Sequence, residues 1–347
     1  MRKIFFIKIF FFFLSATSFA QQDTTFSVEY FSTKTNISIR ALEAVSDPKA
    51  WFAANHGVWG FTEDAGKTWH IDSLMVDLVY PEFRSIALLN DSTVLLLSIA
   101  SPAYLFKTTN KGKTWRLVYK NSDKDIFFDS MKFSDEKNGI AVGDPIKGCF
   151  QMISTNDGGE NWHPVDCSGI PKALDGEGIF ACSNTSIDIR GNKVWFATGG
   201  KCARLFSSSD FGRHFEAKLA PIDQGTKMSG IFSFDFADDK NCVITGGNYD
   251  KTDSSVENLA VTHDGGKTWK EIKNNKPFFG SCVQWRGDYY FITGNDGTFI
   301  SNGASFKEVK DKSGDGIKFH TLRFSPTGKT LWFAGDKGRI AFINLAP

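Results

Sequence analysis

A turn between two strands is predicted by the stretch Thr262-His263-Asp264-Gly265-Gly266-Lys267-Thr268-Trp269, which has the form S/T-x-D-x-G-x-T-W. The Asp side chain can accept hydrogen bonds from the backbone N–H groups that follow it. The Gly two places on can adopt the left-handed conformation of a tight hairpin. The Thr and Trp then begin a strand, where the indole is large enough to fill the space between two packed sheets.

Four further copies of this turn occur in the chain, at 62–69, 108–115, 155–162 and 208–215, and a shortened copy occurs at 301–306. The aromatic residues that end the copies lie roughly 40 to 50 residues apart, which is the period of a β-propeller with one four-stranded blade per repeat. The position of Asp264 is occupied in the other full copies by Asp64, Asn110, Asp157 and Asp210.

Each turn is preceded by a pair of apolar runs, and seven such pairs predict seven blades. The first runs are Ile39 to Val45, Ser85 to Leu89, Ser130 to Phe133, Ser186 to Ile189, Ile231 to Phe236, Cys282 to Trp285 and Thr321 to Phe324. The second runs are Ala50 to Ala54, Val94 to Ile99, Gly139 to Gly143, Val194 to Gly199, Cys242 to Gly247, Tyr289 to Gly294 and Leu331 to Gly335. The predicted fold is therefore all-β, a seven-bladed propeller of four-stranded antiparallel blades.

The four strands of a blade are called A to D from the axis outward, so the repeated turn lies between C and D. In such a blade the C-to-D and A-to-B turns share one face, here called the box face. The B-to-C and D-to-A connections share the other, here called the funnel face. The five Asp and Asn residues of the turns are thus predicted to be structural and to lie away from any ligand site.

The last repeat has only three strands before the chain ends, because Gly338 to Asn344 is its third. An incomplete blade leaves unpaired strand edges that invite aggregation. The segment from Phe26 to Phe31 has the composition of a strand and precedes the first blade. It is predicted to supply the missing outer strand and to close the ring.

The N-terminus resembles a secretory signal peptide, with Met1-Arg2-Lys3, an apolar run from Ile4 to Leu14, and Ser18-Phe19-Ala20 as a cleavage site. We expect residues 1–20 to be removed and residues 21–347 to form one propeller domain, exported to the periplasm or beyond the cell and without a membrane span. The net charge is +1 and no basic block occurs, so no nucleic-acid partner is expected. Closed edges and scattered charge favour a monomer.

The repeated turns look like Asp-boxes, and the layout resembles the exported Asp-box (BNR-repeat) propellers related to the photosystem II assembly and stability factor. The stretches 138–145 (NGIAVGDP) and 175–178 (DGEG) resemble a bacterial branch of that family. The resemblance covers residues 25 to 345. It implies a seven-bladed propeller with a binding or assembly role, although some members are labelled glycosyl hydrolases or oxidoreductases. Asp-boxes are specific for fold and poor guides to function.

Candidate ligand-binding residues follow from the predicted funnel face, where long loops on a rigid ring carry function. They lie at the starts of A strands or in the B-to-C and D-to-A loops: Arg40, Arg84, Arg204, His320, His56 and Asn248. Several guanidinium groups could clamp a carboxylate-bearing sugar or an acidic peptide end. Alternatively, each Arg pairs with a carboxylate of the adjacent loop and only closes the funnel.

Three classes of function remain, ranked in this order. The first is a binding or assembly module that holds a protein partner or a small anionic ligand. The second is a sialidase-like glycoside hydrolase, for which the catalytic candidates are Tyr249, Glu177, Asp129 and Asp144. The chain reads Ile39-Arg40-Ala41-Leu42 where such enzymes usually carry an Arg-Ile-Pro stretch. The third is an oxidoreductase, although no cofactor motif or metal pattern occurs, and no cofactor is expected.

The six cysteines allow two disulfides in an oxidising compartment. Cys149 and Cys167 are symmetric about the third Asp-box hairpin, and Cys182 and Cys202 are symmetric about the A-to-B turn of blade four. The remaining two, Cys242 and Cys282, have the character of small core residues. The alternative is that all six are buried thiols.

Overall fold

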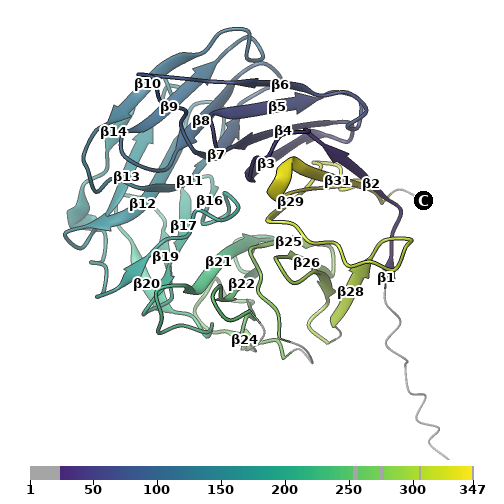
Figure 1. The fold of residues 1–347 in the computed structure, drawn as a ribbon. Helices are drawn as coiled ribbons and strands as arrows, with labels where there is room; N and C mark the ends of the chain where they lie inside the picture. The colour runs from purple at the N-terminus through teal and green to yellow at the C-terminus, as the bar shows by residue number, and fades with distance from the viewer. Residues whose placement is uncertain (1–23, 253–256, 274–276, 305, 346–347) are drawn as a thin grey trace, which may run out of the picture.

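The computed structural model describes residues 24–252, 257–273, 277–304 and 306–345, which form a ring of seven sheets (Figure 1). The predicted seven-bladed propeller is confirmed. Blades one to three comprise β3 (Ile39–Ser46), β4 (Lys49–Ala54), β5 (Val58–Thr62) and β6 (His70–Ser73); β7 (Phe83–Leu88), β8 (Val94–Ser98), β9 (Ala103–Thr108) and β10 (Arg116–Asn121); β11 (Phe128–Phe133), β12 (Gly139–Ile146), β13 (Cys149–Thr155) and β14 (His163–Pro164).

The other four blades follow around the ring in chain order. They comprise β16 (Ile187–Arg190), β17 (Lys193–Ala197), β19 (Arg204–Ser208) and β20 (Glu216–Leu219); β21 (Ser229–Phe236), β22 (Cys242–Asn248), β23 (Leu259–Thr262) and β24 (Lys270–Glu271); β25 (Cys282–Arg286), β26 (Tyr289–Thr293), β27 (Thr298–Ser301) and β28 (Phe306–Lys310); β29 (Thr321–Phe324), β30 (Thr330–Ala334), β31 (Arg339–Asn344) and β2 (Val28–Ser32).

The core lies between neighbouring blades, where the middle strands are covered on both faces. Every residue of β8, β9 and β22 is buried, whereas the outer strand β6 has no buried residue. Trp115, which ends the second Asp-box, packs edge-on against Trp59 of the preceding blade, with ring centroids 5.1 Å apart. A Cβ on Gly112 would meet the Trp59 ring at 2.1 Å, and its φ is +78°, so this turn requires glycine.

The Asp-box turns are held by their own side chains. In the fifth copy the Asp264 carboxylate accepts hydrogen bonds from the Thr268 hydroxyl at 2.6 Å and the Thr268 N–H at 2.9 Å. These bonds hold the pKa of Asp264 well below its ordinary value. The Gly265 N–H donates to Lys240 O in the A-to-B turn of the same blade, at 2.9 Å. The Asp-box turn therefore lies beside the A-to-B turn of the same blade, on the box face, and its Asp is bonded within the turn.

The N-terminal segment closes the ring. Strand β2 pairs antiparallel with β31, with Tyr30 opposite Ala341, and supplies the outer strand of blade seven (Figure 1). This confirms the predicted closure. One further strand, β1 (Thr24–Thr25), adds to the edge of blade six parallel to β28. The predicted signal peptide, residues 1–20, lies outside the described residues.

Blade five carries two short strands that the repeat pattern did not predict. Strand β18 (Gly199–Gly200) leaves blade four and pairs with β21, and β15 (Glu177–Gly178) pairs with β18. A Cβ on Gly230 would lie 2.3 Å from the Cα of Gly199, so this close approach of two backbones requires glycine. Through these two strands, the long connection between blades three and four is attached to blade five.

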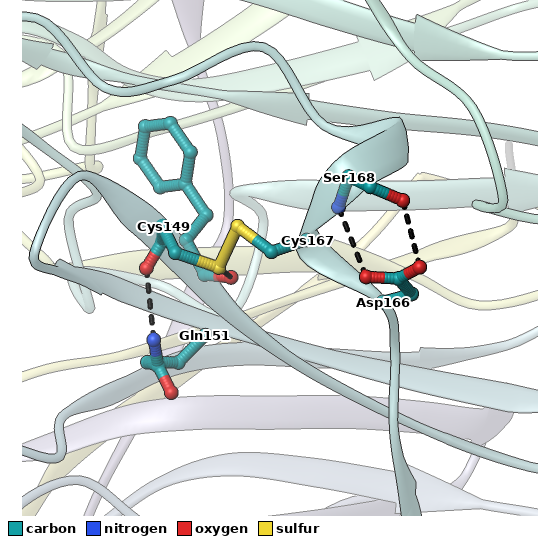
Figure 2. The surroundings of a disulfide bond; sticks show 6 residues. Cys149, Gln151, Asp166, Cys167 and Ser168 are labelled. Atoms are coloured by element: carbon teal, nitrogen blue, oxygen red, sulfur yellow. Dashed lines mark hydrogen bonds between the residues drawn. A yellow bond between two sulfur atoms is a disulfide. The ribbon is translucent and has the colours of Figure 1, made fainter.

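One of the two predicted disulfides is confirmed and the other is wrong. Cys149 and Cys167 are bonded, and Cys167 lies in a short 3-10 turn capped by Asp166, which accepts from the Ser168 N–H (Figure 2). Cys182 and Cys202 are free thiols, because the loop that carries Cys182 runs into the centre of the ring and contacts Arg40. Cys242 and Cys282 are buried thiols, as expected of core residues.

Loss of the disulfide is expected to destabilise the protein. The two cysteines are 18 residues apart, and closing a loop of that size contributes about 3 kcal/mol through the entropy of the unfolded chain. The double variant Cys149→Ser, Cys167→Ser should therefore unfold at lower urea concentration than the oxidised protein. Cys202→Ser, which removes a partly exposed free thiol, serves as the control. An unchanged unfolding midpoint for the double variant would contradict the prediction.

Among the described residues, no helix has the length and apolar character needed to cross a membrane.

Candidate functional site at the funnel face

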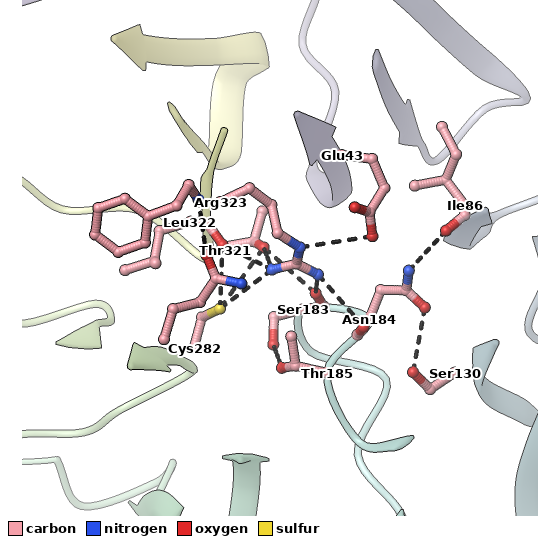
Figure 3. A network of polar contacts seen from close by, with 12 residues as sticks. Glu43, Ile86, Ser130, Ser183, Asn184, Thr185, Cys282, Thr321, Leu322 and Arg323 are labelled. Atoms are coloured by element: carbon pink, nitrogen blue, oxygen red, sulfur yellow. Dashed lines mark hydrogen bonds and ion pairs between the residues drawn. The ribbon is translucent and has the colours of Figure 1, made fainter. Parts of the chain in front are cut away.

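The D-to-A connection between blades three and four fills the centre of the ring. Ser183 donates its hydroxyl to Ser281 O of blade six at 2.8 Å, and Asn184 donates its amide to Ile86 O of blade two at 2.9 Å. Asn184 also accepts from the Ser130 hydroxyl of blade three at 3.1 Å (Figure 3). The turn Ser183–Asn184 therefore acts as a plug that joins blades two, three and six.

Arg323, in the middle of the inner strand β29, holds this plug from blade seven (Figure 3). It is 4% exposed, and its Nη2 donates to Ser183 O at 2.8 Å and to Asn184 O at 3.3 Å. Its Nε lies 3.6 Å from the Glu43 carboxylate of blade one. The buried guanidinium of Arg323 thus connects blade seven with the plug and with blade one.

Arg204 and Glu177, both predicted as site residues, neutralise each other. Arg204 Nε lies 2.8 Å from Glu177 Oε1, and Arg204 Nη2 lies 2.5 Å from Glu177 Oε2. The Glu177 side chain is fully buried and also accepts from the Thr198 hydroxyl at 2.6 Å and the Leu174 N–H at 2.8 Å. Both oxygens of Glu177 are therefore bonded to donors within the fold.

Arg84 is paired in the same way. Its Nε and Nη2 lie 2.8 and 2.5 Å from one oxygen of Glu82, and its Nη1 donates to Ala181 O at 3.1 Å. Glu82 lies two residues before Arg84, on the same side of an extended chain. This spacing is a signal from which the pair could have been predicted.

Arg40 differs from the other arginines because its Nε is buried without a hydrogen-bond partner. Its Nη1 lies 3.2 Å from the Cys182 Sγ, and Tyr249 packs against the cluster that contains Cys182. The Tyr249 ring packs edge-on against Phe279, with centroids 5.4 Å apart. Arg40, Cys182 and Tyr249 thus form one contact group on the funnel side of the ring.

The remaining predicted residues have separate positions. His320 Nε2 lies 2.9 Å from Asp336 Oδ1, and burial lowers the pKa of His320 below its ordinary value although Asp336 acts in the opposite direction. His56 is exposed at the B-to-C turn of blade one, with φ +57°. Asn248 is buried and its side chain accepts from the Asp250 N–H at 3.0 Å, which makes it a turn-forming residue.

A cavity of about 510 Å³ opens on the funnel face beside the plug. It is bordered by four of the predicted residues, Arg84, Asp129, Asp144 and Glu177, and by Gly176 to Ala181 of the long connection. Phe127, Pro145, Phe180 and Met228 give it apolar walls, and Lys227 lies at its border. Tyr249 is not among its lining residues, so the structure does not bring the tyrosine and carboxylates of the sialidase-like alternative into one cavity.

Asp129 and Asp144 are the two carboxyl groups of the cavity that form no ion pair among the described residues, although the positive charge of Arg84 acts on Asp129. Asp129 is 0% exposed, and neither of its oxygens has a hydrogen-bond partner. Burial, followed by repulsion from Asp144, raises the pKa of Asp129 well above its ordinary value. Asp144 is partly buried and accepts from the Ile179 N–H at 2.8 Å, and burial also raises its pKa.

Substituting Asp129→Asn is expected to make the protein more stable at neutral pH than the unchanged protein. Because the pKa of Asp129 is raised on folding, the folded state keeps a proton that the unfolded state loses once the pH exceeds 3.8, the ordinary pKa of an aspartate. Stability therefore falls as the pH rises from about 4 toward the folded pKa, by at most about 1.4 kcal/mol per pH unit. The asparagine variant lacks this loss.

Urea unfolding of both proteins between pH 4 and pH 8 measures this effect. The stability difference between the variant and the unchanged protein should grow with pH. Asp175→Asn, on an exposed residue of the same connection, should show no such growth. A difference that shrinks as the pH rises would contradict the raised pKa.

Two features of the site were not predicted. The first is the plug together with Arg323. The sequence pattern that could have indicated it is a charged residue within the apolar run of an inner strand. The second is Glu82, the partner of Arg84. Among the described residues no group of three or more His, Cys, Asp or Glu is arranged to hold a metal ion.

The comparisons with known proteins agree with this architecture. The model of the BNR/Asp-box repeat family matches residues 260–271, and no curated protein matches the chain. The solved structure described as YCF48 bound to D1 peptide is similar, with 13% identity over 93% of this chain and 99% of that chain and a TM-score of 0.66. YCF48 from Cyanidioschyzon merolae is similar at 12% identity over 92% and 99% of the two chains, with a TM-score of 0.63.

Virginiamycin B lyase from Staphylococcus aureus has the same fold, at 12% identity over 92% of this chain and 100% of that chain, with a TM-score of 0.66. A binding protein and a lyase thus share this ring, which shows that the fold alone does not fix the function. The expected resemblance to the photosystem II assembly factor family is confirmed for the architecture. The chain is a seven-bladed β-propeller that carries BNR/Asp-box repeats.

Proposed function

We propose that this protein is an exported binding module that holds a protein partner on its funnel face. The observation that carries the proposal is the placement of exposed apolar side chains. Nine large apolar side chains of the described residues are exposed, and six belong to D-to-A connections or to the D-strand end that leads into one: Met75, Leu78, Val79, Tyr80, Leu174 and Leu219. Exposed apolar side chains that gather on one face are typical of protein-binding surfaces.

The connection between blades one and two projects the most exposed of these side chains. Val76 and Val79 pair across a two-residue turn, and Leu78 at its tip is 89% exposed. Asp77 and Leu78 have φ of +52° and +62°, a conformation that costs a leucine about 1–2 kcal/mol. The turn is braced by Lys120, whose Nζ lies 2.8 Å from the Asp77 carboxylate. A strained turn that displays leucine to solvent supports a binding role.

Two of the three candidate arginines are paired with glutamates, which weighs against a small anionic ligand as the main occupant. Arg204 is neutralised by Glu177, and Arg84 by Glu82. A ligand carboxylate would have to displace these bonded partners. The similar structure of YCF48 has a peptide bound, which supports a protein partner on this fold. No specific observation favours glycoside hydrolysis, and we expect no turnover of fluorogenic sialosides.

Site-specific photo-crosslinking in cells that export the protein tests the proposal. A photoreactive amino acid replaces Leu78 or Leu174 on the funnel face, or Lys113 or Lys267 on the box face as matched exposed controls. The funnel-face positions are expected to yield a discrete crosslinked protein and the box-face positions none. Crosslinks that form only from the box face, or hydrolysis of sialosides by the purified protein, would contradict the proposal.

A further inference from the structure

Two of the carboxyl groups that line the cavity beside the plug, Asp129 and Asp144, form no ion pair with the described residues. The neighbouring carboxylates are held by arginines, since Glu177 is paired with Arg204 and Glu82 with Arg84. Asp129, by contrast, is fully buried with both oxygens unpartnered, and Asp144 has one backbone donor. Burying a carboxylate without a partner is costly, so the site is incomplete as it stands.

Resting on the proposed function above, we propose that this cavity receives a lysine side chain of the partner, with its ammonium group against Asp144 and with Asp129 behind it. An ammonium group supplies a hydrogen-bond donor to the free oxygen of Asp144 and a positive charge that acts on both carboxyl groups. This occupant has the opposite charge to the one expected from the candidate arginines, because Arg84 and Arg204 are each paired with a glutamate while these two carboxyl groups form no ion pair.

The walls of the cavity fit the aliphatic part of a lysine. Phe127, Pro145, Phe180 and Met228 line it, and its volume is about 510 Å³. Lysine buries its methylene stem along apolar surfaces while its charged end reaches a polar group. The Phe180 ring is held in place by stacking on Phe232, with centroids 3.8 Å apart.

A single free oxygen favours an ammonium group over a guanidinium group. Asp144 Oδ1 already accepts from the Ile179 N–H at 2.8 Å, which leaves Oδ2 for the ligand. A guanidinium binds a carboxylate best through two parallel hydrogen bonds to both oxygens, whereas an ammonium acts as a point charge. Asp129 cannot supply a second accessible oxygen because it is 0% exposed.

The other charged groups around the cavity are accounted for. Arg84 and Arg204 are each neutralised by a glutamate, and the exposed Lys227 at the border is the remaining cation. The cavity therefore has two carboxyl groups without an ion pair, and Lys227 is the one lysine of the chain at its border. Burial raises the pKa of Asp129 and of Asp144, so an ammonium group must displace protons from them and its binding should tighten as the pH rises above the ordinary pKa of an aspartate.

The test uses N-acetyl-lysine methylamide as the probe and N-acetyl-norleucine methylamide, which has the stem without the ammonium group, as the control. Binding is followed by NMR at the amide of Ile179, which donates to Asp144. The lysine probe should shift this amide saturably and the norleucine probe should not. Asp144→Asn and Asp129→Asn should each weaken the lysine probe about tenfold, equivalent to about 1.4 kcal/mol, and should reduce the pH dependence of binding.

Asp175→Asn serves as the matched control, because it removes an exposed carboxylate of the same connection, and its affinity should be unchanged. Lys227→Met should strengthen binding of the lysine probe by removing the competing cation. Equal binding of both probes, or full affinity in the two cavity variants, overturns the inference. If funnel-face crosslinks persist in that case, the proposed function stands and only the lysine occupant is lost.

Discussion

Replacing Arg323 with methionine is expected to lower the free energy of unfolding by about 3–5 kcal/mol, the cost of removing one partner of a buried ion pair. The variant keeps most of the side-chain volume but loses the donors to Ser183 O and Asn184 O. It also leaves the Glu43 carboxylate of blade one without its cation. Because Arg323 joins blades one and seven to the central plug, the loss should affect the whole ring, as measured by urea unfolding.

Arg213→Met is the matched control, since Arg213 is exposed in the fourth Asp-box turn. Surface substitutions of this kind usually change stability by less than about 0.5 kcal/mol. If Arg323→Met unfolds at the same urea concentration as Arg213→Met, the central guanidinium does not hold the ring together, and the plug is held by its other hydrogen bonds alone.

Replacing Glu177 with glutamine is expected to cost a similar amount, about 3–5 kcal/mol, because it leaves the largely buried Arg204 unpaired. In the variant, the N–H groups of the glutamine amide also point toward other donors. These donors, among them the Thr198 hydroxyl, bond the Glu177 carboxylate in the unchanged protein. Strand β15 should then detach from β18 and the floor of the cavity should loosen. Urea unfolding measures the first effect and hydrogen exchange at Gly176 to Ala181 the second.

A double-mutant cycle separates the ion pair from simple packing. Glu177→Leu combined with Arg204→Met removes both charges, and replacing a buried pair by apolar side chains is often close to neutral. The double variant should therefore be more stable than Glu177→Leu alone. Additive losses would show that the two residues do not stabilise each other, contrary to the 2.8 Å contact between Arg204 Nε and Glu177 Oε1.

The ring itself could be predicted from sequence because it repeats. Each Asp-box encodes a turn through local hydrogen bonds, such as those from Thr268 to Asp264, and such contacts need no knowledge of distant residues. The closing strand was also predictable, since a blade without a fourth strand has an open edge. The Cys149–Cys167 disulfide could also be predicted from the sequence, because its two cysteines lie across one hairpin.

The centre of the ring could not be predicted from the repeat, because it is filled by a segment that departs from the repeat. The connection that carries Cys182 turns into the axis, which brings that thiol within 3.2 Å of Arg40 and away from Cys202. Arg204 and Glu177 are 27 positions apart in the sequence. Their pairing depends on the short strands β15 and β18, which no sequence pattern predicted. The sequence therefore predicts on which face the candidate residues lie. It does not predict which of them form ion pairs, because these pairs depend on non-local contacts.

The most direct test of the central claim is hydrogen exchange of the protein alone and in complex with the partner captured by crosslinking. The account predicts slower exchange on binding at residues 74–82 and 174–181 of the funnel face, and no change at the Asp-box turns. Protection confined to the Asp-box turns would contradict it, because the binding surface would then lie on the opposite face of the ring.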